Sequence, residues 1–184
     1  MRIHSKNLKT LAEQAGISVV QLAESLPADS GRRKQKELAQ AKVRNWMAGR
    51  DHPRAKAKDI EAMAGVLGCS PSQIARYTSV FRFSRSSPRK AGLVAELIRG
   101  RSVAEAQALL AFSPKRASVM VGKALEAALA EAQSYDASPD HLVVAESRVD
   151  KGVIIKRFQP KDRGRAHRIE KITSHITIGL EERA

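Results

Sequence analysis

The sequence predicts an α+β fold, with helices predominating up to about residue 134 and strands predominating after it. Apolar residues recur at helical spacing, with capping and stop signals, through most of residues 8–134. From residue 141 onward, runs rich in β-branched and apolar residues replace that spacing. Aromatic residues make up only 4% of the chain, so the core must consist mainly of Ala, Leu, Val and Ile, which favours helices.

Residues 1–79 are expected to form an all-α bundle of short helices. Gly16 marks the end of the first helix, and Ser18 with Gln21 has the spacing of a capping box at the start of the second. Gly68 marks the end of the fourth helix, and Pro71 is well placed in the first turn of the fifth. The expected helices lie around Leu8–Ala12, from Ser18 to Pro27, around Val43–Met47, over Lys56–Leu67, and from Pro71 to about Tyr77.

A polar stretch, PADSGRRKQKELAQA over residues 27–41, separates the second and third expected helices. We expect its central part to be a loop. Its end is compatible with either this loop or the start of the next helix.

Three longer helices are expected in the second part of the chain. The first begins at Ser87-Pro88 and ends at Gly100, with Leu93, Val94, Leu97 and Ile98 expected to face inward. Ser102 and Glu105 form a capping box for a helix over Val103–Phe112. Ser113-Pro114 then starts an Ala-rich helix to about Ser134, whose expected buried face comprises Val121, Ala124, Leu125, Ala128 and Leu129.

Strands are expected at Val80–Phe83, at His141–Val149, in GVIIKRF and in ITSHITIGLEE. The last two runs flank the basic stretch QPKDRGRAHR, so the sequence predicts an extended hairpin with a basic turn. The middle of this hairpin has too few apolar residues to bury itself, which implies that an outside partner holds it.

The net charge is +14, from 33 Lys and Arg against 19 Asp and Glu. Nucleic acid is the favoured partner, because each neutralised phosphate releases counterions. Residues 151–175 carry eight Lys or Arg against two acids. Such a run in isolation is usually only a solvated surface, but here the flanking strands hold it in place and favour a nucleic-acid contact. A second basic cluster comprises Arg82, Arg85, Arg89 and Lys90.

Other classes of protein are disfavoured by the sequence. Cys69 is the single cysteine, which excludes an intrachain disulfide and a multi-cysteine metal site. No apolar run is long enough for membrane insertion and no signal-peptide core follows Met1, so a cytoplasmic location is expected. The histidines lack metal-ligand spacing, and Ser174 and His175 would point to opposite faces of a strand. We therefore expect no catalysis, no metal and no cofactor.

Two segments resemble the bacterial-type ribosomal protein twenty-two family of the large subunit. They are SSPRKAGLVAELIRGRSVAEAQALLAFSPKRA and GVIIKRFQPKDRGRAHRIEKITSHITI, in that order, within residues 80–184. The resemblance implies three helices on a small antiparallel sheet, with an extended hairpin at about 142–181. It also implies a structural, non-enzymatic protein that binds large-subunit rRNA, contacts neighbouring ribosomal proteins and supports assembly. The hairpin tip would line the tunnel that the nascent polypeptide follows.

The same resemblance assigns roles to individual residues. The expected rRNA-binding residues are Arg82, Arg85, Arg89, Lys90, Lys156, Arg157, Arg168, Lys171, Thr173, Ser174 and His175. The expected tunnel-tip residues are Lys161, Asp162, Arg163, Gly164 and Arg165. Asp162 departs from the family pattern, in which the tip is mostly small or basic, and Glu170 and Ile172 also dilute the usual charge.

Residues 1–79 are an extension to that family and form a separate expected domain. LKTLAEQAGISVVQLAESL, VRNWMAGRDHP and KDIEAMAGVLGCSPSQIARY resemble the phage-repressor-like helix-turn-helix group. The resemblance would place the recognition helix and its exit loop at Val43–Pro53, with Lys42, Arg44, Asn45 and Arg50 as possible nucleic-acid contacts. Residues 27–41 replace the usual tight turn, so we favour a surface addition or a nonspecific RNA contact. The alternative is a DNA-binding regulator.

Overall fold

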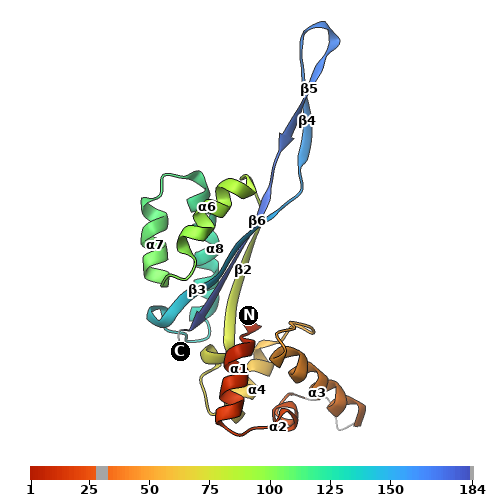
Figure 1. Ribbon diagram of the computed structural model, residues 1–184, viewed down its shortest axis with the longest axis vertical. Coiled ribbons are helices and arrows are strands. Elements are labelled where there is room, and N and C mark those ends of the chain that lie inside the picture. The colour runs from red at the N-terminus through yellow and green to blue at the C-terminus, as the bar shows by residue number, and fades with distance from the viewer. Residues whose placement is uncertain (28–32, 183–184) are drawn as a thin grey trace. The chain divides into compact units, whose positions relative to one another are not determined.

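The computed structural model describes residues 1–27 and 33–182, and the chain divides into two compact units (Figure 1). The N-terminal unit comprises Met1–Tyr77, Glu131–Ala137 and the end of the chain from Glu181. The C-terminal unit comprises Thr78–Ala130 and Ser138–Leu180. Each unit therefore consists of segments that are separated in the sequence, and no single boundary in the chain divides the two units.

The N-terminal unit is mainly helical, as the sequence predicts. The capping box of Ser18 and Gln21 is present, and Gly68 ends its helix in the left-handed conformation, with a φ of 64°. The helices are α1 (Ser5–Gln14), α2 (Val19–Glu24), α3 (Arg33–Met47), α4 (Ala57–Leu67) and α5 (Pro71–Ile74).

Helix α3 begins within the polar stretch that the sequence leaves open. Its bounds show that the end of this stretch, from Arg33 onward, belongs to the helix. The expected loop at the centre of the stretch falls partly on residues 28–32, which lie outside the described residues. Val43 and Trp46 are buried, and the Trp46 indole donates a hydrogen bond to the Pro53 carbonyl at 2.6 Å.

The expectation of a fifth helix to about Tyr77 is wrong. Helix α5 ends at Ile74, and Ala75–Tyr77 open the strand β2 (Ala75–Ser84). The cause is a short strand that the sequence does not reveal, β1 (Arg2–Ile3), which pairs antiparallel with β2 through Ile3 and Ala75. β2 continues to Ser84, so residues 79 and 80 lie within one strand.

The C-terminal unit contains the three longer helices, α6 (Pro88–Ile98), α7 (Val103–Phe112) and α8 (Arg116–Gln133), whose last residues belong to the N-terminal unit. The expected inward face of α6 is partly wrong, because Leu93 and Leu97 are exposed. Ala91 and Ala95 are buried beside Val94 and Ile98. These small residues allow α6 to pack closely against the strand β3 (Leu142–Lys151). The expected buried face of α8 is confirmed except at Leu129, which is half-buried.

Three strands form the sheet of the C-terminal unit, in the order β2–β6–β3, where β6 is Ser174–Glu182. Helices α6, α7 and α8 lie together beside this sheet (Figure 1). A short 3-10 helix, η1 (Pro139–His141), precedes β3. The turn after α6 covers the edge of β3, because the Gly100 N–H donates to the Val144 carbonyl at 2.8 Å and the Val144 N–H donates to Arg101. Edge strands are commonly covered in this way.

The predicted extended hairpin is present. Its first segment is formed by β3 and β6 within the sheet, and its second by β4 and β5. Beyond the sheet, β4 (Ile155–Pro160) pairs only with β5 (Ala166–Lys171), in the register Ile155 with Lys171 and Pro160 with Ala166. This pair, which we call the ribbon, projects away from the helices of its own unit (Figure 1). The α+β fold class that the sequence predicts is therefore confirmed.

Candidate nucleic-acid interface

The ribbon exposes nearly every side chain on both of its faces. Directly paired residues in an antiparallel ladder share a face, and side chains alternate between the two faces along each strand. Lys156 and Arg168 therefore lie on one face of the ribbon. Arg157 and Lys171 lie on the opposite face. All four side chains are exposed, and one ion pair within the ribbon joins Arg168 to Glu170. The ribbon therefore presents cations in two opposite directions.

The tip of the ribbon is a tight turn with three exposed cations. The Lys161 N–H donates to the Arg165 carbonyl at 2.8 Å, and the Arg165 N–H donates to Asp162 at 3.2 Å. Arg163 and Gly164 both adopt left-handed conformations, with φ of 55° and 68°. Among the described residues, no ion pair involves Lys161, Arg163 or Arg165, so Asp162 does not neutralise them by direct contact.

The second basic cluster lies between the end of β2 and the first turn of α6. Arg82, Arg85, Arg89 and Lys90 are all exposed. Ser87 is the N-cap of α6, but its side chain makes no capping hydrogen bond. The first turn of α6 thus combines free backbone N–H groups with two cations, an arrangement that suits a phosphate.

The expected rRNA-binding residues on β6 and just before it differ from these cations in their surroundings. Thr173 and Ser174 are buried, and the Thr173 hydroxyl donates to the Val153 carbonyl at 2.6 Å. His175 is half-buried, and its Nδ1 accepts a hydrogen bond from the Phe83 N–H at 3.2 Å. Their side chains support the base of the ribbon, so we do not place Thr173 and Ser174 in the proposed contact surface.

In the N-terminal unit, the residues of the expected recognition segment are not equivalent. Lys42, Arg44 and Arg50 are exposed, whereas the Asn45 amide donates to the His52 carbonyl at 3.0 Å and holds the exit loop. Helix α2 ends at Glu24 and α3 begins at Arg33. The segment between them includes residues 28–32, which lie outside the described residues, so the expected departure from a tight turn stays a prediction.

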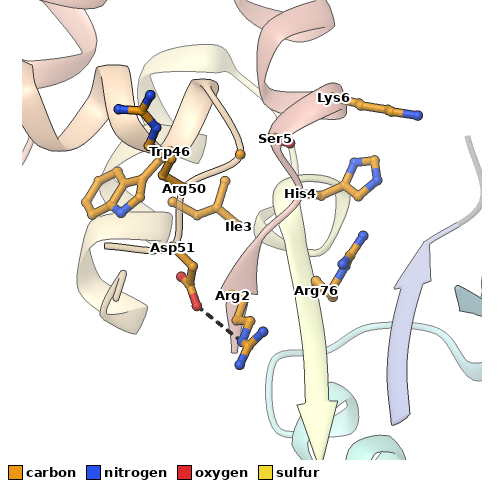
Figure 2. Close-up of a pocket in the computed structure, with 10 residues that line it drawn as sticks. Arg2, Ile3, His4, Ser5, Lys6, Trp46, Arg50, Asp51 and Arg76 are labelled. Atoms are coloured by element: carbon orange, nitrogen blue, oxygen red, sulfur yellow. Dashed lines mark ion pairs between the residues drawn. The ribbon is translucent and has the colours of Figure 1, made fainter. Parts of the chain in front are cut away.

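Arg50 lines a pocket of about 230 Å³ between the start of α1 and the loop after α3 (Figure 2). Most polar groups of this pocket already have partners within the protein. Arg2 pairs with Asp51 at 3.2 Å, and Glu181 pairs with both His4 and Arg76. Lys6 points away from the pocket (Figure 2). These pairings make the pocket a structural feature rather than a strong ligand site.

Within residues 1–27 and 33–182, no group of three His, Cys, Asp or Glu residues has the geometry to hold a metal ion. None of the helices in these ranges is both long and apolar enough to cross a membrane. Burial raises the pKa of the Cys69 thiol, which disfavours its reactive thiolate form. The described residues therefore offer surface cations, rather than a catalytic cluster, as their most distinctive chemistry.

An α+β body that carries a long ribbon with cations on both faces is typical of proteins that assemble with nucleic acid. Residues 79–181 match the family described as ribosomal protein L22p/L17e. A relative, the large ribosomal subunit protein uL22 of Clostridium tetani, is 42% identical over 106 residues, which are 57% of this chain and 96% of the relative. The chain belongs to the ribosomal protein L22p/L17e family, which confirms the resemblance found in its second part.

The exposed aromatic residues were missed by the sequence reasoning. Phe83 was assigned only to a strand, and Phe158 only to the hairpin, although both are exposed and close in sequence to candidate RNA-binding cations. Basic residues interleaved with aromatics are a known sign of nucleic-acid binding, because bases stack on aromatic rings. That sign was present in VFRFSR and IIKRFQ.

Proposed function

We propose that this protein is a structural, non-enzymatic constituent of the large ribosomal subunit, bound to its rRNA in the cytoplasm and supporting its assembly. The observation that carries the proposal is the ribbon, together with membership of the family. A two-stranded ribbon has little stability of its own in water. Its cations face in two opposite directions, so a partner that surrounds it with phosphates would supply what the protein lacks.

The basic cluster at the start of α6 extends this proposed interface. Arg82 and Arg85 follow one another along β2 and the turn after it, and Arg89 and Lys90 lie in the first helical turn. Phosphate contacts from these four side chains would fix the position of the body on the RNA, because such contacts set register and orientation. Neighbouring ribosomal proteins would then contact other parts of the surface.

The decisive experiment is fractionation of cells that produce the tagged full chain. We expect the protein to sediment with large subunits at moderate salt and to be released as salt is raised, since its contacts are largely electrostatic. A protein found only in ribosome-free fractions would overturn the proposal.

We also propose that the ribbon tip lines the tunnel of the nascent polypeptide. The tip is the part of the ribbon farthest along the chain from the sheet, and its three cations have no ion-pair partner among the described residues. A photoactivatable residue at Arg163 should cross-link to a radiolabelled nascent chain in stalled ribosomes. The matched control is the same probe at Phe112, which is 89% exposed at the end of α7 and should give no such product. Equal labelling at both positions would contradict a tunnel location.

For the N-terminal unit, we propose a nonspecific RNA contact or a surface addition, and we keep a DNA-binding regulator as the alternative. The internal hydrogen bond of Asn45 favours the first proposal, because it engages one of the expected contact side chains within the protein. The full chain should then bind a DNA duplex and its scrambled version with equal affinity at the same salt. A preference of a thousandfold or more for one duplex would support the regulator instead.

A further inference from the structure

Phe83 has a backbone conformation that is unusual for a large aromatic residue. It lies near the end of β2 with a φ of 56°, in the left-handed region that bulky side chains rarely adopt. Its side chain is 57% exposed, and the next residue, Ser84, is buried. Strained backbone of this kind persists only where the surroundings hold it, and it is concentrated at functional sites.

His175 contacts Phe83 through both the backbone and the ring. The Phe83 N–H donates to His175 Nδ1 at 3.2 Å, and the two rings meet edge-to-face, with centroids 4.9 Å apart and planes at 75°. An edge-to-face contact covers at most one face of the Phe83 ring. Because Phe83 is largely exposed, we take part of its ring surface to be available to a flat partner.

Phe83 is one of the residues around a pocket of about 310 Å³ at the base of the ribbon. The pocket is lined by Phe83, Arg85, Val153, Ile155 and Thr173. Its shape depends on a close approach of two chain segments, because the Gly152 N–H donates to the Thr173 carbonyl at 2.9 Å and the Thr173 hydroxyl donates to the Val153 carbonyl. The result is a largely apolar pocket that has Arg85 among its lining residues.

The charges around this pocket favour a nucleic-acid occupant over an apolar peptide. None of its described lining residues is acidic. Arg85 and its sequence neighbours Arg82, Arg89 and Lys90 are exposed, and none of them makes an ion pair with another residue in the described part of the chain. A flat apolar surface beside unpaired cations matches the two halves of a nucleotide, an aromatic base and a phosphate.

We infer that the pocket formed by Phe83, Val153, Ile155 and Arg85 binds one unpaired nucleobase of an RNA strand. The base stacks on the open face of Phe83, and the guanidinium of Arg85 contacts the adjacent phosphate. RNA-binding proteins generally recognise unpaired bases by stacking them on aromatic side chains. This inference rests on the proposed binding of large-subunit rRNA, and it adds a specific nucleotide subsite to that binding.

The test compares full-length variants for binding to large-subunit rRNA transcribed from the same organism. Phe83→Leu keeps an apolar side chain but removes the stacking ring, and we expect about a tenfold loss of affinity, as for the removal of one base–aromatic stack. Phe83→Tyr keeps the ring and should restore binding to within about twofold of wild type. The matched control is Phe112→Leu, which removes an exposed phenyl ring far along the chain from the pocket and should have no effect.

A second measurement identifies the occupant. A photoactivatable benzoyl-phenylalanine at position 83, in assembled large subunits, should cross-link to a single unpaired nucleotide. Cross-linking only to protein, or equal RNA affinity for Phe83→Leu and wild type, would overturn the inference. If wild type itself fails to bind the rRNA and to sediment with large subunits, the proposed function fails instead. Circular dichroism on each variant verifies that it remains folded.

Discussion

Strand β6 and the β4–β5 ribbon are neighbours in the chain and both are antiparallel, but their side chains are covered in different ways. β6 lies between β2 and β3, and Ile176, Thr177, Ile178 and Leu180 are all buried. Consecutive buried residues mean that both faces of β6 are covered. In the ribbon, only Ile155 and Ile169 are even half-buried. Strand β6 is stabilised by the protein's own core, whereas the ribbon has no core.

This difference shows that one chain can use separate segments for folding and for binding a partner. Burial of apolar surface stabilises the sheet, at roughly 25 cal/mol for each Å² removed from water. The ribbon makes no comparable contribution, and its cations would repel one another without a polyanion. Its conformation is therefore expected to depend on the partner, and its amides should exchange with solvent faster than those of β6 in the isolated protein.

The largest expected effect comes from removing apolar volume from β6, the buried strand of the comparison. Ile178→Ala leaves a cavity in the fully buried core and should lower the free energy of unfolding by about 2–5 kcal/mol. Phe158→Ala removes a larger side chain from the ribbon, but that side chain is 72% exposed, so the cost should be within about 0.5 kcal/mol. Urea denaturation of both variants measures this contrast. Similar losses would mean that the ribbon is stabilised within the protein after all.

The next effect concerns charge at the tip of the ribbon. Reversing Arg163 and Arg165 to Glu should reduce rRNA affinity by at least about tenfold and lower the slope of log affinity against log salt by about 2. The matched control is the double reversal of Lys115 and Lys123, two exposed residues at or near α8, which changes the net charge equally. If the two double variants bind alike, only net charge matters, and the tip is not within the RNA.

The third effect tests the junction between β6 and the ribbon. A Cβ added at Gly152 would lie 2.5 Å from Thr173 Oγ1 and 3.1 Å from the Thr173 carbonyl oxygen, so Gly152→Ala should destabilise the protein by about 1–3 kcal/mol. Gly122→Ala is the control, because nothing lies within 4 Å of the added Cβ in helix α8. This helical substitution should stabilise by about 0.5–1 kcal/mol. Thermal unfolding compares the two, and a neutral Gly152→Ala would show that the junction can relax.

Much of the fold was predictable because the signals are local. Ser18 caps α2 through Gln21, Ser102 accepts from the Glu105 N–H, and Gly100 ends the α6 turn with a φ of 76°. The errors arose where distant segments meet. Ala75 and Arg76 are extended and pair with β1. Ala91 and Ala95 are buried in place of Leu93 and Leu97, on a helix that packs against β3.

The candidate interface was also predictable in part, because its main signals are local in the sequence. The positions of the cations follow directly from the sequence, and their exposure follows from the lack of apolar residues around them. The sequence did not show that the Thr173 and Ser174 side chains are buried. Thr173, for example, contacts Gly152 and Val153, about 20 residues away. It also did not single out Phe83.

The sequence by itself determined the approximate positions of most helices, that the ribbon has no core, and that cations concentrate along it. These properties depend on the chemistry of residues near one another in the chain. The tertiary structure alone decided that Phe83 is exposed beside a pocket and in contact with His175, 92 residues later. Contacts between residues so far apart in the chain depend on how the segments pack together, and no local pattern encodes them.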